Sequence, residues 1–220
     1  MPSPSTLPMC TIIGTFTTTL NGRYNRVWRT ASALHAQWGM YMKIAIISGS
    51  LHPQSRSYVL ACRLEEVVQK RGAETDLIDL RDYDLPLHTG TGDCKTPEVL
   101  ALVERMQAVD GVAVAAPIYV YDTNAAVKNF VDLTGRAWSD KPVGLLCAAG
   151  GRSSYMSIMG LANSLMLDFR CVIVPRFVYA TGGDFANDRT AEMSVESEEI
   201  CERIDQLADA LLQLAGALRA

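Results

Sequence analysis

Residues 43–57 read Lys43-Ile44-Ala45-Ile46-Ile47-Ser48 and then Gly49-Ser50-Leu51-His52-Pro53-Gln54-Ser55-Arg56-Ser57. The first part is a nearly continuous apolar run, which is typical of a strand covered on both faces of a parallel sheet. The second part is a short, serine-rich turn that leads into a helix predicted over residues 55–71. Apolar residues of that helix share one stripe, namely Val59, Leu60, Leu64, Val67 and Val68. The stretch therefore predicts a buried strand, a tight loop and a helix in direct succession.

The same alternation continues along the chain. Further strands are predicted at residues 74–80, 112–116, 142–148 and 171–174, and further helices at residues 96–109, 123–135, 153–168 and 194–219. Five strands that alternate with five helices indicate an α/β protein whose parallel sheet carries helices on both faces. Ligands of such sheets bind beyond the carboxyl ends of the strands. The loops after the first, third and fourth strands are therefore candidate sites.

The loop at residues 49–57 has the chemistry of a phosphate site. A helix amino terminus offers free backbone N–H groups and a partial positive charge, and Ser50, Ser55 and Ser57 can add hydroxyl donors. Two better-known phosphate patterns are missing. No Gly-Lys pair completes a Walker loop, and Gly49 stands without the further glycines of the dinucleotide fingerprint. The alternative is a serine-rich helix cap that holds no ligand.

Three motifs, in order along the chain, resemble those of the NAD(P)H-dependent FMN reductases. Residues 49–57 are similar to the family's G-S-L-R-x-x-S-x-N loop. Residues 117–129, from Pro117 to Asn129, follow the spacing of its P-x-Y-x-x-S-x-P-G-x-L-K-N motif without a gap. Residues 148–152 resemble the small, glycine-rich turn that the family places after the fourth strand. The resemblance covers most of the chain, from residue 43 to about residue 180.

This resemblance implies a flavodoxin-like, doubly wound, five-stranded parallel sheet in the order 2-1-3-4-5. It implies FMN as the cofactor, NADPH or NADH as the hydride donor, a small-molecule electron acceptor, and a homodimer or homotetramer. No catalytic side chain is expected, because a flavin accepts hydride at its own ring. The expected cofactor-binding residues are Ser50, His52, Gln54, Ser55, Arg56, Ser57, Pro117, Ile118, Tyr119, Val120, Tyr121, Ala149, Gly150, Gly151 and Arg152.

The members of this set have different expected roles. Ser50, Ser55 and Ser57 with their backbone amides are expected to hold the phosphate. A bulky apolar residue at position 55 is expected to weaken FMN retention without unfolding the domain. Backbone N–H groups of residues 117–121 and 149–151 are expected to face the flavin ring, as in an oxyanion hole.

Some of these residues have an alternative interpretation. Tyr119 and Tyr121 either form a wall beside the flavin or simply pack the loop. Arg152 either attracts the phosphate of a nicotinamide nucleotide or lies solvated on the surface.

The chain also departs from the family pattern. His52 replaces the family's arginine and so removes a permanent charge near the phosphate. Ser57 replaces the family's asparagine, and Asp122, Asn124 and Ala125 replace its serine, proline and glycine. These changes affect the expected contacts at the flavin's edge more than the presence of the flavin.

Composition excludes several other classes of function. The 220-residue chain has a net charge of -4, whereas a nucleic-acid binder would show a basic stripe. No apolar run reaches the roughly 18 to 20 residues that cross a bilayer, so no membrane partner is expected. The six cysteines form no C-x-x-C pair and the three histidines are scattered, so no metal site is expected. Cys147 and Cys171 lie in apolar runs and are predicted to be buried thiols.

Residues 1–42 differ from the rest of the chain. They hold three of the 20 basic residues and none of the 24 acidic ones, which leaves residues 43–220 with a net charge of -7. We expect an N-terminal extension at residues 1–42, poorly ordered or arm-like, and a flavodoxin-like FMN-binding domain at residues 43–220. The unpaired cysteines favour a cytoplasmic location. Organellar targeting by the acid-free, arginine-bearing extension is the lesser alternative.

Two other functions are compatible with an FMN site. A flavodoxin-like electron carrier would bind FMN without turning over a nicotinamide nucleotide, and a redox-sensing module would not turn over at all. Carriers are usually strongly acidic, whereas the charge of residues 43–220 is moderate. The leading hypothesis is an enzyme that takes hydride from NAD(P)H and reduces a flavin, a quinone, an azo compound or a similar small acceptor.

Overall fold

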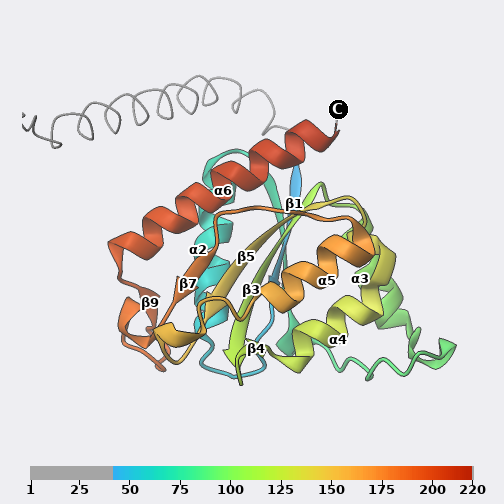
Figure 1. Cartoon of the computed structure of the whole chain (residues 1–220), viewed down its shortest axis with the longest axis horizontal. Coiled ribbons are helices and arrows are strands. Elements are labelled where there is room, and N and C mark those ends of the chain that lie inside the picture. The colour runs from blue at the N-terminus through green and yellow to red at the C-terminus, as the bar shows by residue number, and fades with distance from the viewer. Residues whose placement is uncertain (1–41, 220) are drawn as a thin grey trace, which may run out of the picture. The chain divides into compact units, whose positions relative to one another are not determined.

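The computed structural model describes residues 42–219. Apart from Met42, the predicted extension at residues 1–42 lies outside the described residues. The elements that follow form a central sheet with helices on both of its faces (Figure 1).

The sheet is built from strands in five successive positions. They are β2 (Glu74–Asp79), β1 (Lys43–Ser48), β3 (Gly111–Tyr119), β5 (Pro142–Ala148) and a fifth position shared by β6 (Val172–Ile173) and β7 (Val178–Ala180). All these pairs are parallel. The predicted flavodoxin-like α/β fold and its strand order are confirmed.

In the described part of the chain, five helices cover the two faces of this sheet. Helices α2 (Arg56–Lys70) and α6 (Glu198–Arg219) lie on one face, and α3 (Pro97–Gln107), α4 (Ala125–Thr134) and α5 (Met159–Phe169) lie on the other (Figure 1). Each face has its own hydrophobic core, because alternate residues of each strand point to opposite sides. In β1, Ile47 packs in the core under α3, α4 and α5, and Ile46 packs in the core under α2 and α6.

Short elements complete the described chain. Three short strands are β4 (Asp122–Thr123), β8 (Phe185–Ala186) and β9 (Ser194–Val195). Single 3₁₀ turns are η2 (Leu80–Asp82), η3 (Gly92–Cys94), η4 (Gly135–Trp138), η5 (Arg152–Ser154) and η6 (Gly182–Asp184).

The fifth position of the sheet, where one strand was predicted at residues 171–174, holds two strands, and the second of them lies beyond the predicted range. Val172–Ile173 pairs with the start of β5, and Val178–Ala180 pairs with its end. Pro175 lies between the two pieces. A proline has no N–H group for the ladder, so pairing stops there and resumes only three residues later.

Two predicted helices begin later than the sequence pattern indicates. The helix predicted from residue 153 begins at Met159, because residues 152–154 form a 3₁₀ turn and the Ser157 hydroxyl donates to the Ser154 carbonyl instead of joining a helix. The helix predicted from residue 194 begins at Glu198. There, Ser194–Val195 pairs in antiparallel fashion with Phe185–Ala186. In both places a local turn or strand pair replaces the first turn of the helix.

Candidate functional site

The loop after β1 is held tightly against α4. The Gly49 N–H donates to the Ala115 carbonyl at 2.8 Å, and the Asn124 side-chain amide donates to the Gly49 carbonyl at 2.7 Å. A Cβ at Gly49 would lie 2.1 Å from Cγ2 of Val127, so this position requires glycine. Asn124, which stands where the family pattern has proline, therefore positions the loop from the start of α4.

The three serines of this loop are all buried but differ in their hydrogen bonds. The Ser50 hydroxyl accepts from the His52 N–H at 3.2 Å, and the Ser55 hydroxyl caps α2 by accepting from the Tyr58 N–H at 3.0 Å. The Ser57 hydroxyl is 1% exposed and has no hydrogen-bond partner within residues 42–219. A buried polar group without a partner is costly, so Ser57 is the clearest indication of a missing ligand.

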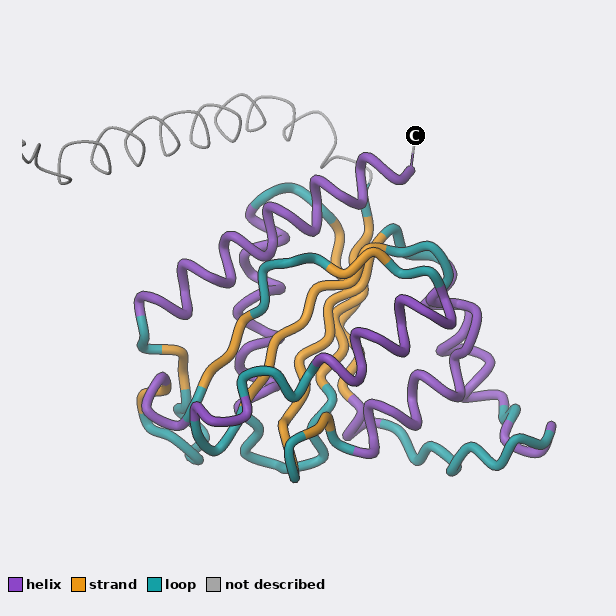
Figure 2. Tube along the Cα trace, in the orientation of Figure 1, coloured by secondary structure: helices purple, strands orange, loops and turns teal. Residues whose placement is uncertain are grey.

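Three loops predicted from the sequence meet around one cavity of about 190 Å³. We call it the three-loop cavity. It lies where the carboxyl ends of β1, β3 and β5 share one edge of the sheet (Figure 2). It is lined by Ser50, Arg56, Ser57, Pro117, Ile118, Tyr119, Ala148, Ala149, Gly150 and Arg189.

Most of the sequence-predicted site residues line this cavity or follow directly on its lining. His52, Gln54, Ser55, Val120, Tyr121, Gly151 and Arg152 do not line it. Sequence reasoning missed Ala148 and Arg189. Arg189 lies 137 residues from His52 in a segment without a motif, so only the folded chain brings it to the loop.

A two-residue hairpin forms the rim beside β3. Tyr119 pairs with Asp122, and the two residues between them have positive φ angles, 51° at Val120 and 63° at Tyr121. These angles are those of a type I′ turn, which usually contains asparagine or glycine. Val120 is fully exposed, and Tyr119 and Tyr121 are more than half exposed. The turn therefore places the Tyr119 side chain on the lining of the cavity, with strained backbone directly after it.

Arg56 ties the start of α2 to a later segment. Its guanidinium donates to both carboxylate oxygens of Asp188, at 2.7 and 2.5 Å, and its Nη1 donates to the Ala149 carbonyl at 3.4 Å. This pairing raises the pKa of Arg56 and lowers the pKa of Asp188. Arg56 thus joins the first loop, the third loop and the segment around residue 188.

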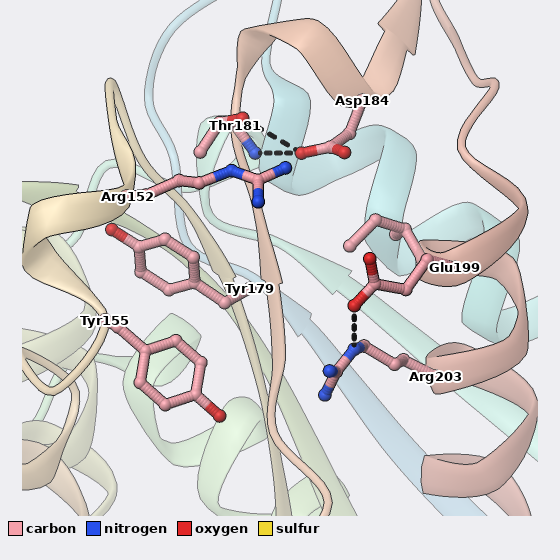
Figure 3. A pocket seen from close by; sticks show the side chains of 8 residues that line it. Arg152, Tyr155, Tyr179, Thr181, Asp184, Glu199 and Arg203 are labelled. Carbon is pink, nitrogen blue, oxygen red and sulfur yellow. Dashed lines mark hydrogen bonds and ion pairs between the residues drawn. The ribbon is translucent and has the colours of Figure 1, made fainter.

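Arg152 faces a different pocket of about 240 Å³, which we call the tyrosine pocket (Figure 3). Its guanidinium points into the space between Tyr179 and Asp184 (Figure 3). The rings of Tyr155 and Tyr179 pack edge to face, with their centroids 5.3 Å apart. The Tyr179 hydroxyl donates to the Gly151 carbonyl at 2.6 Å. Arg203 pairs with Glu199 on the far wall. The third loop therefore separates the tyrosine pocket from the three-loop cavity.

Neither of the two buried thiols of the sheet region, Cys147 and Cys171, lines the three-loop cavity. Burial raises the pKa of Cys147 to about 12 and that of Cys171 to about 11. Both are buried free thiols, as predicted, and a protonated thiol is a poor nucleophile. Over residues 42–219 no group of three histidine, cysteine or acidic side chains is placed to hold a metal ion.

Comparison with known proteins gives the family. The family model described as NADPH-dependent FMN reductase matches residues 42–186, which includes all three loops.

The chain belongs to this family.

An FMN reductase (NADPH) from Pseudomonas aeruginosa is 29% identical over 79% of this chain and 92% of its own length. The NADH-dependent FMN reductase SfnF of Pseudomonas fluorescens is 31% identical over 80% of this chain and 92% of its own length. The crystal structure of an oxidoreductase from Corynebacterium diphtheriae has the same fold, with a TM-score of 0.65 and 24% identity over 80% of this chain and 97% of that chain.

As a member of this family, the chain is an oxidoreductase that uses FMN and takes its electrons from a nicotinamide nucleotide. The residues of the three-loop cavity fit that cofactor. The first N–H groups of α2 have no partner within the helix, and the unpartnered Ser57 hydroxyl lines the cavity beside them. These are donors of the kind that a phosphate monoester accepts from.

Proposed function

We propose that this protein holds the phosphate of FMN in the three-loop cavity and uses the bound flavin to reduce a small-molecule acceptor. The observation that carries the proposal is the buried Ser57 hydroxyl, which has no partner among the described residues and lines a cavity at the start of α2. Ser50 and the amides of Arg56 and Ser57 complete the set of donors. Ser55 acts by capping α2 and so fixes the direction of those amides.

The flavin, when bound, accepts a hydride and passes the electrons on. The protein orients it and stabilises negative charge. Backbone N–H groups of the hairpin at residues 119–122 and of the turn at residues 149–151 are the proposed donors for that charge, by the same electrostatics as an oxyanion hole. Tyr119 and Tyr121 form the proposed wall that excludes water from one side of the ring. Tyr119 lines the cavity, and Tyr121 is exposed two residues later on the same hairpin, which supports this role.

The tyrosine pocket is the proposed contact for the nicotinamide nucleotide. Arg152 and Arg203 supply positive charge for its phosphates, and Tyr155 and Tyr179 supply aromatic surface next to the third loop. Arg203 pairs with the carboxylate of Glu199, and the carboxylate of Asp184 lines the same pocket as Arg152. These carboxylates offset part of the positive charge of the arginines, so the pocket is proposed to orient the nucleotide more than to attract it.

The acceptor class, the assembly and the location are parts of the same proposal. A small flavin, quinone or azo acceptor fits an open site with aromatic side chains at its rim. A homodimer or homotetramer is supported by exposed apolar residues in the segments that follow β1, β3 and β5: Leu51, Val120, Tyr121, Tyr155 and Met156. Free cysteines support a cytoplasmic location. Within residues 42–219, no helix has the length and apolar character to span a membrane. Residues 1–42 are the proposed N-terminal extension, and residues 43–220 are the proposed FMN-binding domain.

One experiment separates the enzyme from an electron carrier. The purified protein, loaded with FMN, is mixed anaerobically with NADPH or NADH while the flavin absorbance near 450 nm is followed, which is roughly where oxidised flavins absorb. Rapid bleaching is expected. A dithionite control establishes that the bound flavin can be reduced. Flavin that dithionite bleaches but neither nucleotide reduces would favour the carrier, and a protein that takes up no FMN would contradict the proposed site.

A further inference from the structure

The phosphate loop lacks a permanent cation at position 52, but a guanidinium from a distant segment lies there. Nη1 of Arg189 is 3.4 Å from Nδ1 of His52 and donates to the Gln54 carbonyl at 2.7 Å. Arg189 also lines the three-loop cavity, together with Ser50 and Ser57. A positive charge therefore occupies the side of the loop where histidine replaces the family's arginine.

The backbone around Arg189 is fixed in an unusual conformation. Asn187 and Arg189 both have positive φ angles, 49° and 62°, which non-glycine residues adopt at some cost. Asp188 between them is clamped by the two hydrogen bonds from Arg56. Gly182, at the start of the same segment, is so close to Arg56 that a Cβ there would lie 2.5 Å from its Nη2. These contacts hold the segment against the start of α2.

The adjacent carboxylate, Asp188, feels the charge of Arg189, which helps to lower its pKa, but its oxygens are hydrogen-bonded by another guanidinium. The neighbouring Asp188 pairs with Arg56, and no ion pair within residues 42–219 includes Arg189. The hydrogen-bond partners of Arg189 in the phosphate loop are the Gln54 carbonyl and the His52 ring, and neither is a carboxylate. A guanidinium in this situation retains donors and net charge for an anion.

We propose that Arg189 binds the phosphate group of FMN and supplies the cation that position 52 lacks. The inference rests on the proposed FMN site and adds to it a residue from outside the matched family region, which ends at Ala186. It also gives the segment at residues 181–195 a role. That segment brings Arg189 to the loop, while the pair between Arg56 and Asp188 holds it in place.

The test compares FMN with riboflavin, which lacks the phosphate. Dissociation constants are measured by quenching of flavin fluorescence on the cofactor-free protein. In Arg189→Gln we expect FMN to bind about tenfold more weakly, the lower end for a charge-assisted hydrogen bond, because the site is exposed. Riboflavin should bind as to the wild type, within about twofold. Adding His52→Arg to Arg189→Gln should restore most of the lost FMN affinity, because it returns a guanidinium to the same side of the loop.

The matched control is Arg170→Gln, which removes an exposed arginine that pairs with Asp140 near the opposite edge of the sheet. This substitution should change neither the affinity for FMN nor that for riboflavin. Unchanged FMN affinity in Arg189→Gln would overturn the inference, and so would an equal loss for FMN and riboflavin, since that would make Arg189 a brace for the loop. A wild-type protein that binds no FMN would overturn the proposed function as well.

Discussion

The serine hydroxyl groups of the phosphate loop differ in their hydrogen bonds, and this difference determines what each substitution would do. Ser55 is occupied as the cap of α2, whereas Ser57 is buried with no partner in the described part of the chain. A bulky residue at position 55 remains a predicted way to weaken FMN binding. Loss of the cap would also cost about 1 kcal/mol of stability, so position 55 does not separate binding from folding.

A substitution at position 57 separates the effect on FMN binding from the effect on folding better than one at position 55. Ser57→Ala should leave the free energy of unfolding of the cofactor-free protein unchanged or raise it by up to about 1 kcal/mol, because it removes an unsatisfied buried hydroxyl. FMN should bind about tenfold more weakly, because one phosphate donor is lost. Urea denaturation and flavin fluorescence titration measure the two effects.

Ser48→Ala is the matched control for this prediction. Ser48 is also fully buried with an unpartnered hydroxyl among residues 42–219, but it does not line the three-loop cavity. It should have the same effect on stability and none on FMN affinity. Equal FMN affinities for both variants would argue against a phosphate contact at Ser57.

Among the elements, the hairpin between β3 and β4 stores backbone strain next to the site. Val120 is β-branched and has a φ angle of 51°. Its side chain is fully exposed, so burial does not offset the cost of this backbone conformation. Left-handed backbone costs roughly 1–2 kcal/mol for such a residue, and asparagine tolerates it far better. The turn is therefore held by its register with β4 and not by the preference of its own residues.

Val120→Asn should raise the free energy of unfolding by about 1 kcal/mol, because asparagine suits the type I′ turn. Val120→Ile, which keeps the branched Cβ, should leave it unchanged. Urea denaturation of the two variants and the wild type tests this. Equal stability of the asparagine and isoleucine variants would mean that the turn is not strained.

At the scale of the whole molecule, the two cores meet in a sheet whose central strands are buried along nearly their whole length. Cys147 lies near the end of β5, paired with Ala116 on one side and Tyr179 on the other. Burial raises the pKa of its thiol from 9.0 to about 12. Below pH 9 the thiol is protonated in both folded and unfolded chains. Above pH 9 the unfolded chain loses the proton and the folded one keeps it, so stability falls as the pH rises.

This predicts alkaline destabilisation that depends on Cys147. Between pH 9 and about pH 11 the free energy of unfolding should fall by up to about 1.4 kcal/mol per pH unit for each such thiol. Urea denaturation across this window, in the presence of a reductant, should show a shallower slope for Cys147→Ala. Cys201→Ala, which removes a partly exposed thiol on α6, is the control. A slope that the Cys147 variant does not change would contradict the prediction.

The predictable part of the fold and the site depends on local patterns. The run from Lys43 to Ser48 is apolar because both of its faces are buried, and Gly49 is required where the chain passes Val127. Because parallel strands end at the same edge, the order of elements was enough to bring the loops at residues 49–57, 117–121 and 148–150 around one cavity. Local composition was less useful at Pro175, where one predicted strand became two.

The sequence alone determined the α/β fold and the three loops, because these depend on periodicity and on short motifs. The strand order and the family followed from the resemblance of three motifs to those of known FMN reductases. Only the tertiary structure determined which serine lacks a partner, which pocket Arg152 faces and which cation stands beside His52. Arg189 reaches the loop through contacts with residues 135 and 137 positions away. Such contacts arise when the packed sheet brings distant segments together, so they leave no pattern along the chain.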